Sequence, residues 1–279
     1  MSKLVRLLFL AVLFFVITNC GTTKKNTNST PSSTSLKPKI EIEEEPYVGV
    51  SKNERKNYFP TTNKETKWVD SIYKTMSIDE KIGQLFMVAA YSNKDEAHFK
   101  DIDKLITENK IGGVIFFQGG PSRQIKLTNR FQAKSKIPLF IGIDAEWGLS
   151  MRLDSTYKYP WNMTLGAIRD LKLIEKVGKN MAEDTKRIGA QFNFAPVLDI
   201  NTNPLNPIIG NRSFGEDKKN VTNHAIALMQ GTQSNGIFAT GKHFPGHGDT
   251  ATDSHHTLPQ INFSKNRLDV VELYPYKRM

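Results

Sequence analysis

The stretch DLKLIEKVGKNMAEDTKRIGAQFNFAPVLDI (residues 170–200) joins two kinds of sequence pattern without a break. The apolar residues of its first part recur every three or four positions, and they are Leu171, Ile174, Val177 and Met181. This spacing predicts a helix with one apolar face. The second part, AQFNFAPVLDI, is a short apolar run of the kind found in buried strands. A helix that leads directly into a buried strand is the repeating unit of a parallel α/β sheet.

The same alternation extends over the chain from about Trp68, where we expect the folded part to begin. Ser77 and Glu80 form a capping box, which predicts a helix start directly before the first apolar run. Polar, helix-like stretches separate the other predicted strands, which are QLFMVAA (84–90), IGGVIFF (111–117), IPLFIGID (137–144) and GIFATGKHF (236–244). The sequence therefore predicts five parallel strands.

Two α/β architectures fit this pattern: a (β/α)8 TIM-type barrel and a doubly wound open sheet. A Gly-x-Gly-x-x-Gly motif is missing after the first predicted strand, which disfavours the dinucleotide-binding form of the open sheet. A further helix is predicted from about Ser264, and VVELYPYKRM (270–279) reads as the middle of a helix. A complete barrel has about eight strands, so the barrel interpretation implies truncation after about five or six strands, while the open sheet remains the alternative.

The N-terminal segment MSKLVRLLFLAVLFFVITNC (1–20) has the pattern of an export signal. A short basic start precedes an apolar run from Leu7 to Ile17, which is too short to span a bilayer and suits the core of a signal peptide. Cys20 is the only cysteine, and its position resembles the lipobox of bacterial lipoproteins, although Asn19 stands where a smaller residue is usual. We expect lipidation at Cys20 and a membrane-anchored protein of the cell envelope; an ordinary cleaved signal and an uncleaved anchor are the alternatives.

Composition separates a tether from the folded part. Residues 21–60 are rich in Ser, Thr, Lys, Asn and Pro, which predicts a flexible linker before a folded part at 61–279.

A single cysteine excludes a disulfide within the chain. The formal net charge is +10, but charges of both signs alternate along the sequence, so the balance does not indicate a nucleic-acid partner.

Polar residues that end the predicted strands point to one site. Asp144 and Glu146 close the third run, Asp199 closes the fourth, and Lys242 and His243 close the fifth. Ligands of parallel α/β folds bind at the carboxyl ends of the strands, so these ends are the predicted location of the site.

The stretch KHFPGHGDTATDSHH (242–256) holds four of the six histidines. Pro245 and the neighbouring glycines break the strand sharply. Asp253 and His255 lie two residues apart, so in extended backbone both side chains project to the same side. The carboxylate would then hold the imidazole, and such a pair exchanges protons near neutral pH.

Two other interpretations of this stretch remain open. His255 and His256 fit solvated loop residues, and a metal site is conceivable from His243, His247, Asp253 and His255. The spacing matches no compact zinc pattern such as His-Glu-x-x-His, so no metal and no cofactor are expected.

KHFPGHGDTATDSH (242–255) closely resembles the signature of family 3 glycoside hydrolases of the β-N-acetylglucosaminidase type. IDAEWGLSMR (143–152) looks like the Asp-x-Glu-Gly-Gly-x-x-x-Arg segment of that family, and IGNRSFG (209–215) looks like its Gly-x-Arg-Ser-Phe segment. The resemblance covers roughly residues 68–279. It implies a barrel enzyme that removes terminal β-linked N-acetylglucosamine, with retention, from peptidoglycan fragments or related glycans.

The resemblance also implies roles for particular residues. His255 is the implied general acid/base and Asp253 its partner. The residues implied to bind the N-acetylglucosamine ring are Asp144, Arg152, Arg212, Lys242 and His243. The nucleophile of the family is an aspartate on a later strand, and we find no matching aspartate in this chain.

Trp147 departs from the family pattern because it replaces the first of the paired glycines. Together with Tyr157, Tyr159 and Trp161 it could serve as a sugar platform, although packing is the simpler interpretation of aromatic residues in a loop. Three other functions remain open: a sugar-binding lipoprotein without catalysis, a metal-dependent hydrolase, and phosphorolysis in place of hydrolysis.

Overall fold

The computed structural model describes residues 62–279, all of which belong to one compact unit. The predicted signal (1–20), with the lipidation site Cys20, and the predicted linker (21–60) lie outside the described residues. Within residues 62–279, no helix combines the length and the apolar content needed to cross a membrane.

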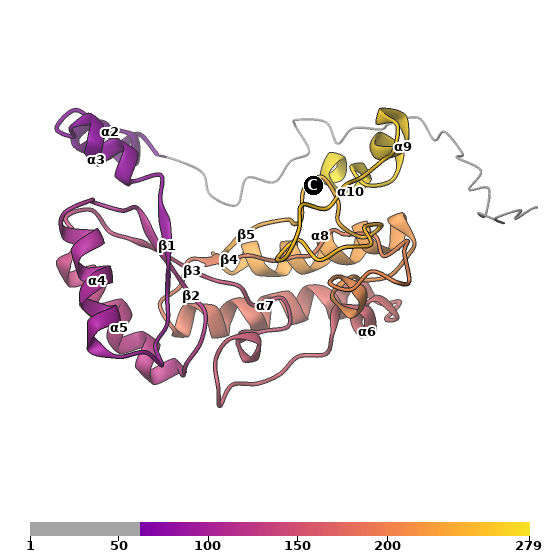
Figure 1. Cartoon of the computed structure of the whole chain (residues 1–279). Helices are drawn as coiled ribbons and strands as arrows, with labels where there is room; N and C mark the ends of the chain where they lie inside the picture. Colours follow the sequence, from indigo (N-terminus) through magenta and orange to yellow (C-terminus); the bar gives the residue numbers. More distant parts are fainter. Residues whose placement is uncertain (1–61) are drawn as a thin grey trace, which may run out of the picture. The chain divides into compact units, whose positions relative to one another are not determined.

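Five parallel strands form one sheet, and their order in space is their order in the chain (Figure 1). The strands are β1 (Met87–Ala90), β2 (Gly113–Phe116), β3 (Phe140–Ile143), β4 (Phe192–Asn193) and β5 (Phe238–Ala239). Each strand pairs with the next in parallel register, for example Val88 with Val114 and Val114 with Ile141. A doubly wound sheet reverses its order at a switch point, whereas a barrel does not. The observed order therefore confirms the barrel-type fold.

A helix connects each strand to the next. These helices are α4 (Glu96–Thr107), α5 (Pro121–Lys134), α7 (Leu171–Arg187) and α8 (Lys218–Ser234). Figure 1 shows α7 and α8 running side by side. Their backbones approach closely at two glycines: a Cβ on Gly178 would lie 2.2 Å from the carbonyl oxygen of Leu228, and one on Gly231 would lie 2.0 Å from that of Glu175. Only glycine permits this approach.

Apolar residues form two buried clusters. The first joins β1, β2 and β3 to α4 and α5, and it includes the stacked rings of Phe116 and Phe131. The second lies around α7 and α8 and contains Ile174 and Met181, as the helical spacing predicts. Leu171 does not belong to it: this residue is exposed because it occupies the first position of α7, beyond the cluster.

The described structure begins with two helices, α2 (Asn63–Tyr73) and α3 (Ile78–Gly83). The predicted capping box of Ser77 and Glu80 is present at the start of α3. Trp68, near which folded sequence was expected to begin, lies inside α2, so helical structure begins five residues earlier, at Asn63. A second capping box, formed by Thr62 and Glu65, starts this helix. No residue of α2 is buried, so the apolar pattern gave no signal there.

The last two strands are shorter than the apolar runs that predicted them. Pro196 follows β4 and has no backbone N–H to extend the ladder. Beyond the two strands, the segments stay joined by irregular hydrogen bonds: the N–H of Thr240 donates to the carbonyl oxygen of Ala195, and the N–H of Leu198 donates to that of Lys242.

The C-terminal helix prediction was correct at its start and wrong in its extent. Ser264 caps α9 (Lys265–Val270), as predicted. The helix does not continue through the following residues; a turn intervenes before α10 (Tyr274–Arg278). Pro275 lies in the first turn of α10, where the missing N–H of proline costs nothing.

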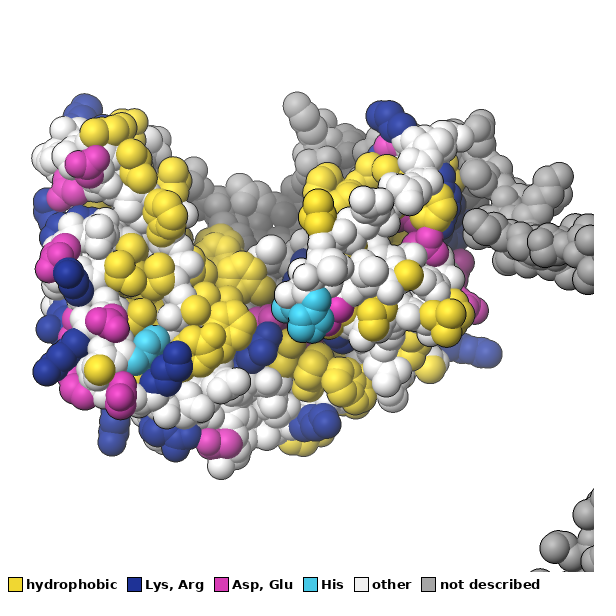
Figure 2. Space-filling model, in the orientation of Figure 1, with side chains coloured by type: hydrophobic (Ala, Val, Ile, Leu, Met, Phe, Trp, Pro, Cys, Tyr) yellow, Lys and Arg dark blue, Asp and Glu magenta, His cyan; other side chains and the backbone are white. Residues whose placement is uncertain are grey.

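The outer edges of β1 and β5 carry no neighbouring strand within residues 62–279. Apolar side chains gather over the middle of the face drawn in Figure 2. Leu85 and Phe86, directly before β1, are 84% and 56% exposed. A large apolar area therefore remains uncovered in the described part of the chain.

Candidate active site

The five predicted sugar-binding residues all follow strands of the sheet. Asp144 comes directly after β3, and Lys242 and His243 come shortly after β5. Arg152 follows the short helix η2 (Leu149–Met151), and Arg212 ends the short helix η3 (Gly210–Arg212). The carboxyl ends of the strands thus bring these residues together, as the sequence predicts.

Asp144 lies between two cations. Its Oδ1 is 2.5 Å from Nζ of Lys242, and its Oδ2 is 2.5 Å from Nη2 of Arg152. Burial alone would raise the pKa of the Asp144 carboxyl, but Lys242 and Arg152 outweigh burial and hold this pKa below its ordinary value. Asp144 is therefore a charged acceptor at neutral pH.

Glu146 is the centre of the site, although the sequence pattern around it predicts no particular role. Its side chain is fully buried. Both carboxylate oxygens bind Arg212, with distances of 2.9 Å to Nε and 2.7 Å to Nη2, and Oε1 also lies 2.7 Å from Nζ of Lys242. We call the set of Asp144, Glu146, Arg152, Arg212 and Lys242 the charge cluster.

Asp199, which the sequence analysis also left without a role, positions His243. Its Oδ2 is 2.6 Å from Nδ1 of His243, and its Oδ1 accepts the backbone N–H groups of His243 and His247. Nη2 of Arg212 lies 3.1 Å from Nε2 of the same ring. Since arginine only donates, Nε2 is the acceptor for Arg212 and Nδ1 is the donor to Asp199. His243 is thus joined to the charge cluster in one tautomer.

Asp253 and His255 form the predicted pair, although not in the predicted conformation. The segment is a turn and not extended, and Oδ1 of Asp253 accepts from the backbone N–H of His255 at 2.8 Å. The same oxygen lies 2.7 Å from Nδ1 of the ring. These two hydrogen bonds lower the pKa of the Asp253 carboxyl.

The pair is separate from the charge cluster. The His255 side chain is 71% exposed, and none of the hydrogen bonds or ion pairs described for the pair reaches a residue of the charge cluster. His256 is exposed as well. Across residues 62–279, the structure gathers no group of three or more His, Cys, Asp or Glu side chains suited to a metal ion.

The charge cluster is chemically suited to a polyhydroxylated ligand. Its cations offer charge-assisted N–H donors, and its carboxylates accept from hydroxyl groups. The ion pairs hold these side chains in place before any ligand arrives, which reduces the entropy lost on binding.

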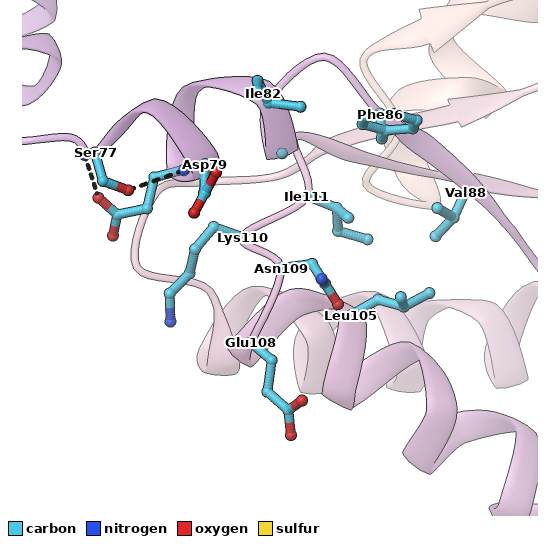
Figure 3. A pocket seen from close by; sticks show the side chains of 12 residues that line it. Ser77, Asp79, Ile82, Phe86, Val88, Leu105, Glu108, Asn109, Lys110 and Ile111 are labelled. Carbon is cyan, nitrogen blue, oxygen red and sulfur yellow. Dashed lines mark hydrogen bonds between the residues drawn. The ribbon is translucent and has the colours of Figure 1, made fainter.

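A separate hollow of about 870 Å³ lies elsewhere in the fold (Figure 3). Figure 3 shows apolar side chains of Ile82, Phe86 and Leu105 around it, with Lys110 and Glu108 among its polar residues. Lys110 and Ile111 precede β2, so this hollow lies at the amino ends of the strands, and none of its lining residues belongs to the charge cluster. Since barrel active sites lie at the opposite ends, we assign it no catalytic role.

A sheet of parallel strands in sequential order, with buried charges at their carboxyl ends, defines the class of (β/α)-barrel proteins. The sequence profile of the glycosyl hydrolase family 3 N terminal domain matches residues 77–279. The chain therefore belongs to glycosyl hydrolase family 3.

Similar proteins include a beta-hexosaminidase A from Pseudoalteromonas piscicida, which is 34% identical over 189 residues, or 63% of this chain and 32% of that protein. A beta-hexosaminidase from Nitrosomonas eutropha is 36% identical over 181 residues, or 61% of this chain and 51% of that protein. The chain thus spans about a third to a half of the length of these relatives.

Two solved structures resemble the fold. A family 3 β-N-acetylglucosaminidase from Paenibacillus matches with a TM-score of 0.66 and 38% identity, over 72% of this chain and 39% of that chain. The β-glucoside phosphorylase BglX matches with a TM-score of 0.72 and 27% identity, over 77% of this chain and 38% of that chain.

Replacing the central carboxylate should destabilise the fold. In Glu146→Gln, Arg212 and Lys242 lose their shared anion inside the protein, and loss of one partner of a buried ion pair costs about 3–5 kcal/mol. Urea unfolding at neutral pH measures the change. Glu108→Gln is the matched control, because Glu108 pairs with Lys104 at the surface and such pairs contribute about 0–1 kcal/mol. If the two substitutions lower the free energy of unfolding equally, Glu146 is not the central anion of the charge cluster.

Acid should weaken the contribution of Asp144 to stability. The pKa of Asp144 is lowered in the folded state, so its stabilising effect is fully present above the unfolded value of about 3.9 and disappears as pH falls through the folded value. The free energies of unfolding of the wild type and Asp144→Asn should therefore converge on acidification below pH about 4. Asp154→Asn, at an exposed pair with Arg123, is the control. If the difference in the free energy of unfolding between the wild type and Asp144→Asn stays constant on acidification, the ion pairs of Asp144 do not stabilise the fold.

Proposed function

We propose that this chain supplies the sugar-binding residues and the acid/base pair of an exported β-N-acetylglucosaminidase. The enzyme would remove terminal β-linked N-acetylglucosamine from peptidoglycan fragments or related glycans. The observation that carries the proposal is the convergence of Asp144, Arg152, Arg212, Lys242 and His243 at the carboxyl ends of the strands. The relatives named beta-hexosaminidase and the similar β-N-acetylglucosaminidase structure support it.

In this proposal the charge cluster orients the sugar ring. Asp144 accepts hydrogen bonds from two hydroxyl groups, and Lys242 and Arg152 donate to hydroxyl oxygens beside it. Because these side chains already hold one another, binding aligns the glycosidic bond without first ordering the site.

His255 is the proposed general acid/base. Asp253 holds Nδ1, so the exposed Nε2 is left to exchange the proton. The lowered pKa of Asp253 keeps its carboxylate ionised, so it remains an acceptor for Nδ1 of the ring. His255 would protonate the leaving glycosidic oxygen in the first step and remove a proton from water in the second.

The retaining mechanism also needs a carboxylate nucleophile, and we assign this role to no residue of the charge cluster. Asp144 is engaged by Lys242 and Arg152. Asp199 is fully buried and holds His243. A nucleophile must instead be free to reach the anomeric carbon.

Loss of the acid/base should abolish most turnover. In the full-length gene product, His255→Ala should lower the release of chromophore from an aryl β-N-acetylglucosaminide by about 10²- to 10⁴-fold. His256→Ala is the control, since it removes the adjacent exposed imidazole and leaves both hydrogen bonds between His255 and Asp253 in place. Normal rates in His255→Ala would show that the dyad assignment is incorrect.

Phosphorolysis is a second candidate because the fold also resembles a β-glucoside phosphorylase. The same assay distinguishes the two when it is run with and without inorganic phosphate: a phosphorylase forms a sugar 1-phosphate, and a hydrolase forms the free sugar. Calorimetric binding of N-acetylglucosamine without any turnover would instead favour a binding protein.

We further propose that the protein is a lipoprotein of the cell envelope, anchored through Cys20. The support is the signal-like pattern of residues 1–20 and the position of this single cysteine. Cells fed a radiolabelled fatty acid should label the wild type and not Cys20→Ala, and the variant should leave the membrane fraction. Equal labelling of both would exclude lipidation at this residue.

A further inference from the structure

An aromatic pair lies in the loop between β3 and α6 (Asn162–Gly166). The ring centroids of Trp147 and Trp161 are 4.1 Å apart, and their planes are inclined by 47°. Both residues are partly buried, so each keeps some surface accessible to solvent. Trp147 stands where the family pattern resembled by this segment has glycine, so the indole is an addition to that pattern.

Both tryptophans are next to residues that hold Arg212. Glu146, directly before Trp147, binds the guanidinium group of Arg212. Asn162, directly after Trp161, is buried and donates from Nδ2 to the carbonyl oxygen of Arg212 at 2.7 Å. Two separate contacts therefore hold the backbone next to each tryptophan to Arg212 of the charge cluster.

The loop is also held internally. Gly148 has a φ of +87°, and a Cβ on it would lie 2.5 Å from the ring of Tyr159, so glycine is required there. The backbone N–H of Tyr159 donates to the carbonyl oxygen of Trp147, and its hydroxyl donates to Asp184 on α7. Trp147 is thus positioned without a ligand.

We propose that Trp147 and Trp161 form a second sugar subsite, which binds the ring linked to the N-acetylglucosamine held by the charge cluster. This subsite rests on the proposed function. The C–H bonds on one face of a β-linked pyranose carry partial positive charge, and the face of an indole is negative. The charge cluster would then bind the polar edge of one ring, while the indole pair binds the apolar face of the next.

The test compares one sugar ring with two. The probes are N-acetylglucosamine and the β-1,4-linked disaccharide of N-acetylglucosamine with sulfur as the linking atom, which glycosidases do not cleave. Calorimetry on the full chain should show that the disaccharide binds about tenfold more tightly. Trp147→Ala should remove this preference and leave the monosaccharide affinity unchanged, whereas Trp147→Phe should retain most of it.

Trp68→Ala is the matched control, because Trp68 lies on α2 and is 53% exposed outside this loop. Near-ultraviolet circular dichroism establishes that each variant is folded, and Trp161→Ala provides a second variant with the same expectation. Equal affinity of the wild type for both sugars, or a preference that survives in folded Trp147→Ala, would overturn the subsite and leave the pair as packing.

A failure of the proposed function gives a different result. If Asp144→Ala does not weaken monosaccharide binding, the assignment of the charge cluster is wrong whatever Trp147→Ala does. If neither sugar binds to the wild type, both the proposed function and the subsite are overturned.

Discussion

The fully buried carboxylate of Glu146 is the interaction on which the site depends. A lone buried carboxylate is costly, and here Arg212 and Lys242 compensate it with three close contacts. Glu146 thus holds two cations, and one of them, Lys242, also binds the second anion, Asp144. The segments after β3, β4 and β5 are therefore joined by charge as well as by backbone hydrogen bonds.

Much of this arrangement could be predicted from sequence. The alternation of apolar runs and helical spacing gave five parallel strands, and the motif resemblance selected the five residues that the structure brings to the strand ends. Periodicity was informative there because the strands are buried and the helices bury one face. It was less informative at the edges: α2 buries no residue, and Leu171 begins its helix beyond the apolar cluster.

Glu146 and Asp199 show what sequence reasoning missed. Both were visible as strand-end carboxylates, but their partners are remote in sequence, since Arg212 lies 66 residues after Glu146. Burial and pairing are tertiary properties that no local pattern records. The turn at Asp253 was missed for a local reason. The Asp253 carboxylate accepts from the backbone N–H of His255, and this hydrogen bond favours a turn over the extended conformation.

The spacing of the ion pairs also bears on synthesis by the ribosome. Asp144 and Lys242 are separated by 98 residues, so a nascent chain carries the two carboxylates long before Lys242 emerges. During that interval the first three strands and their helices can pack through local contacts. Arg152 and Arg212 can pair with Asp144 and Glu146 during this interval, and Lys242, the last partner of both carboxylates, is added only later. The charge cluster is therefore complete only after the segment that follows β5 has been synthesised.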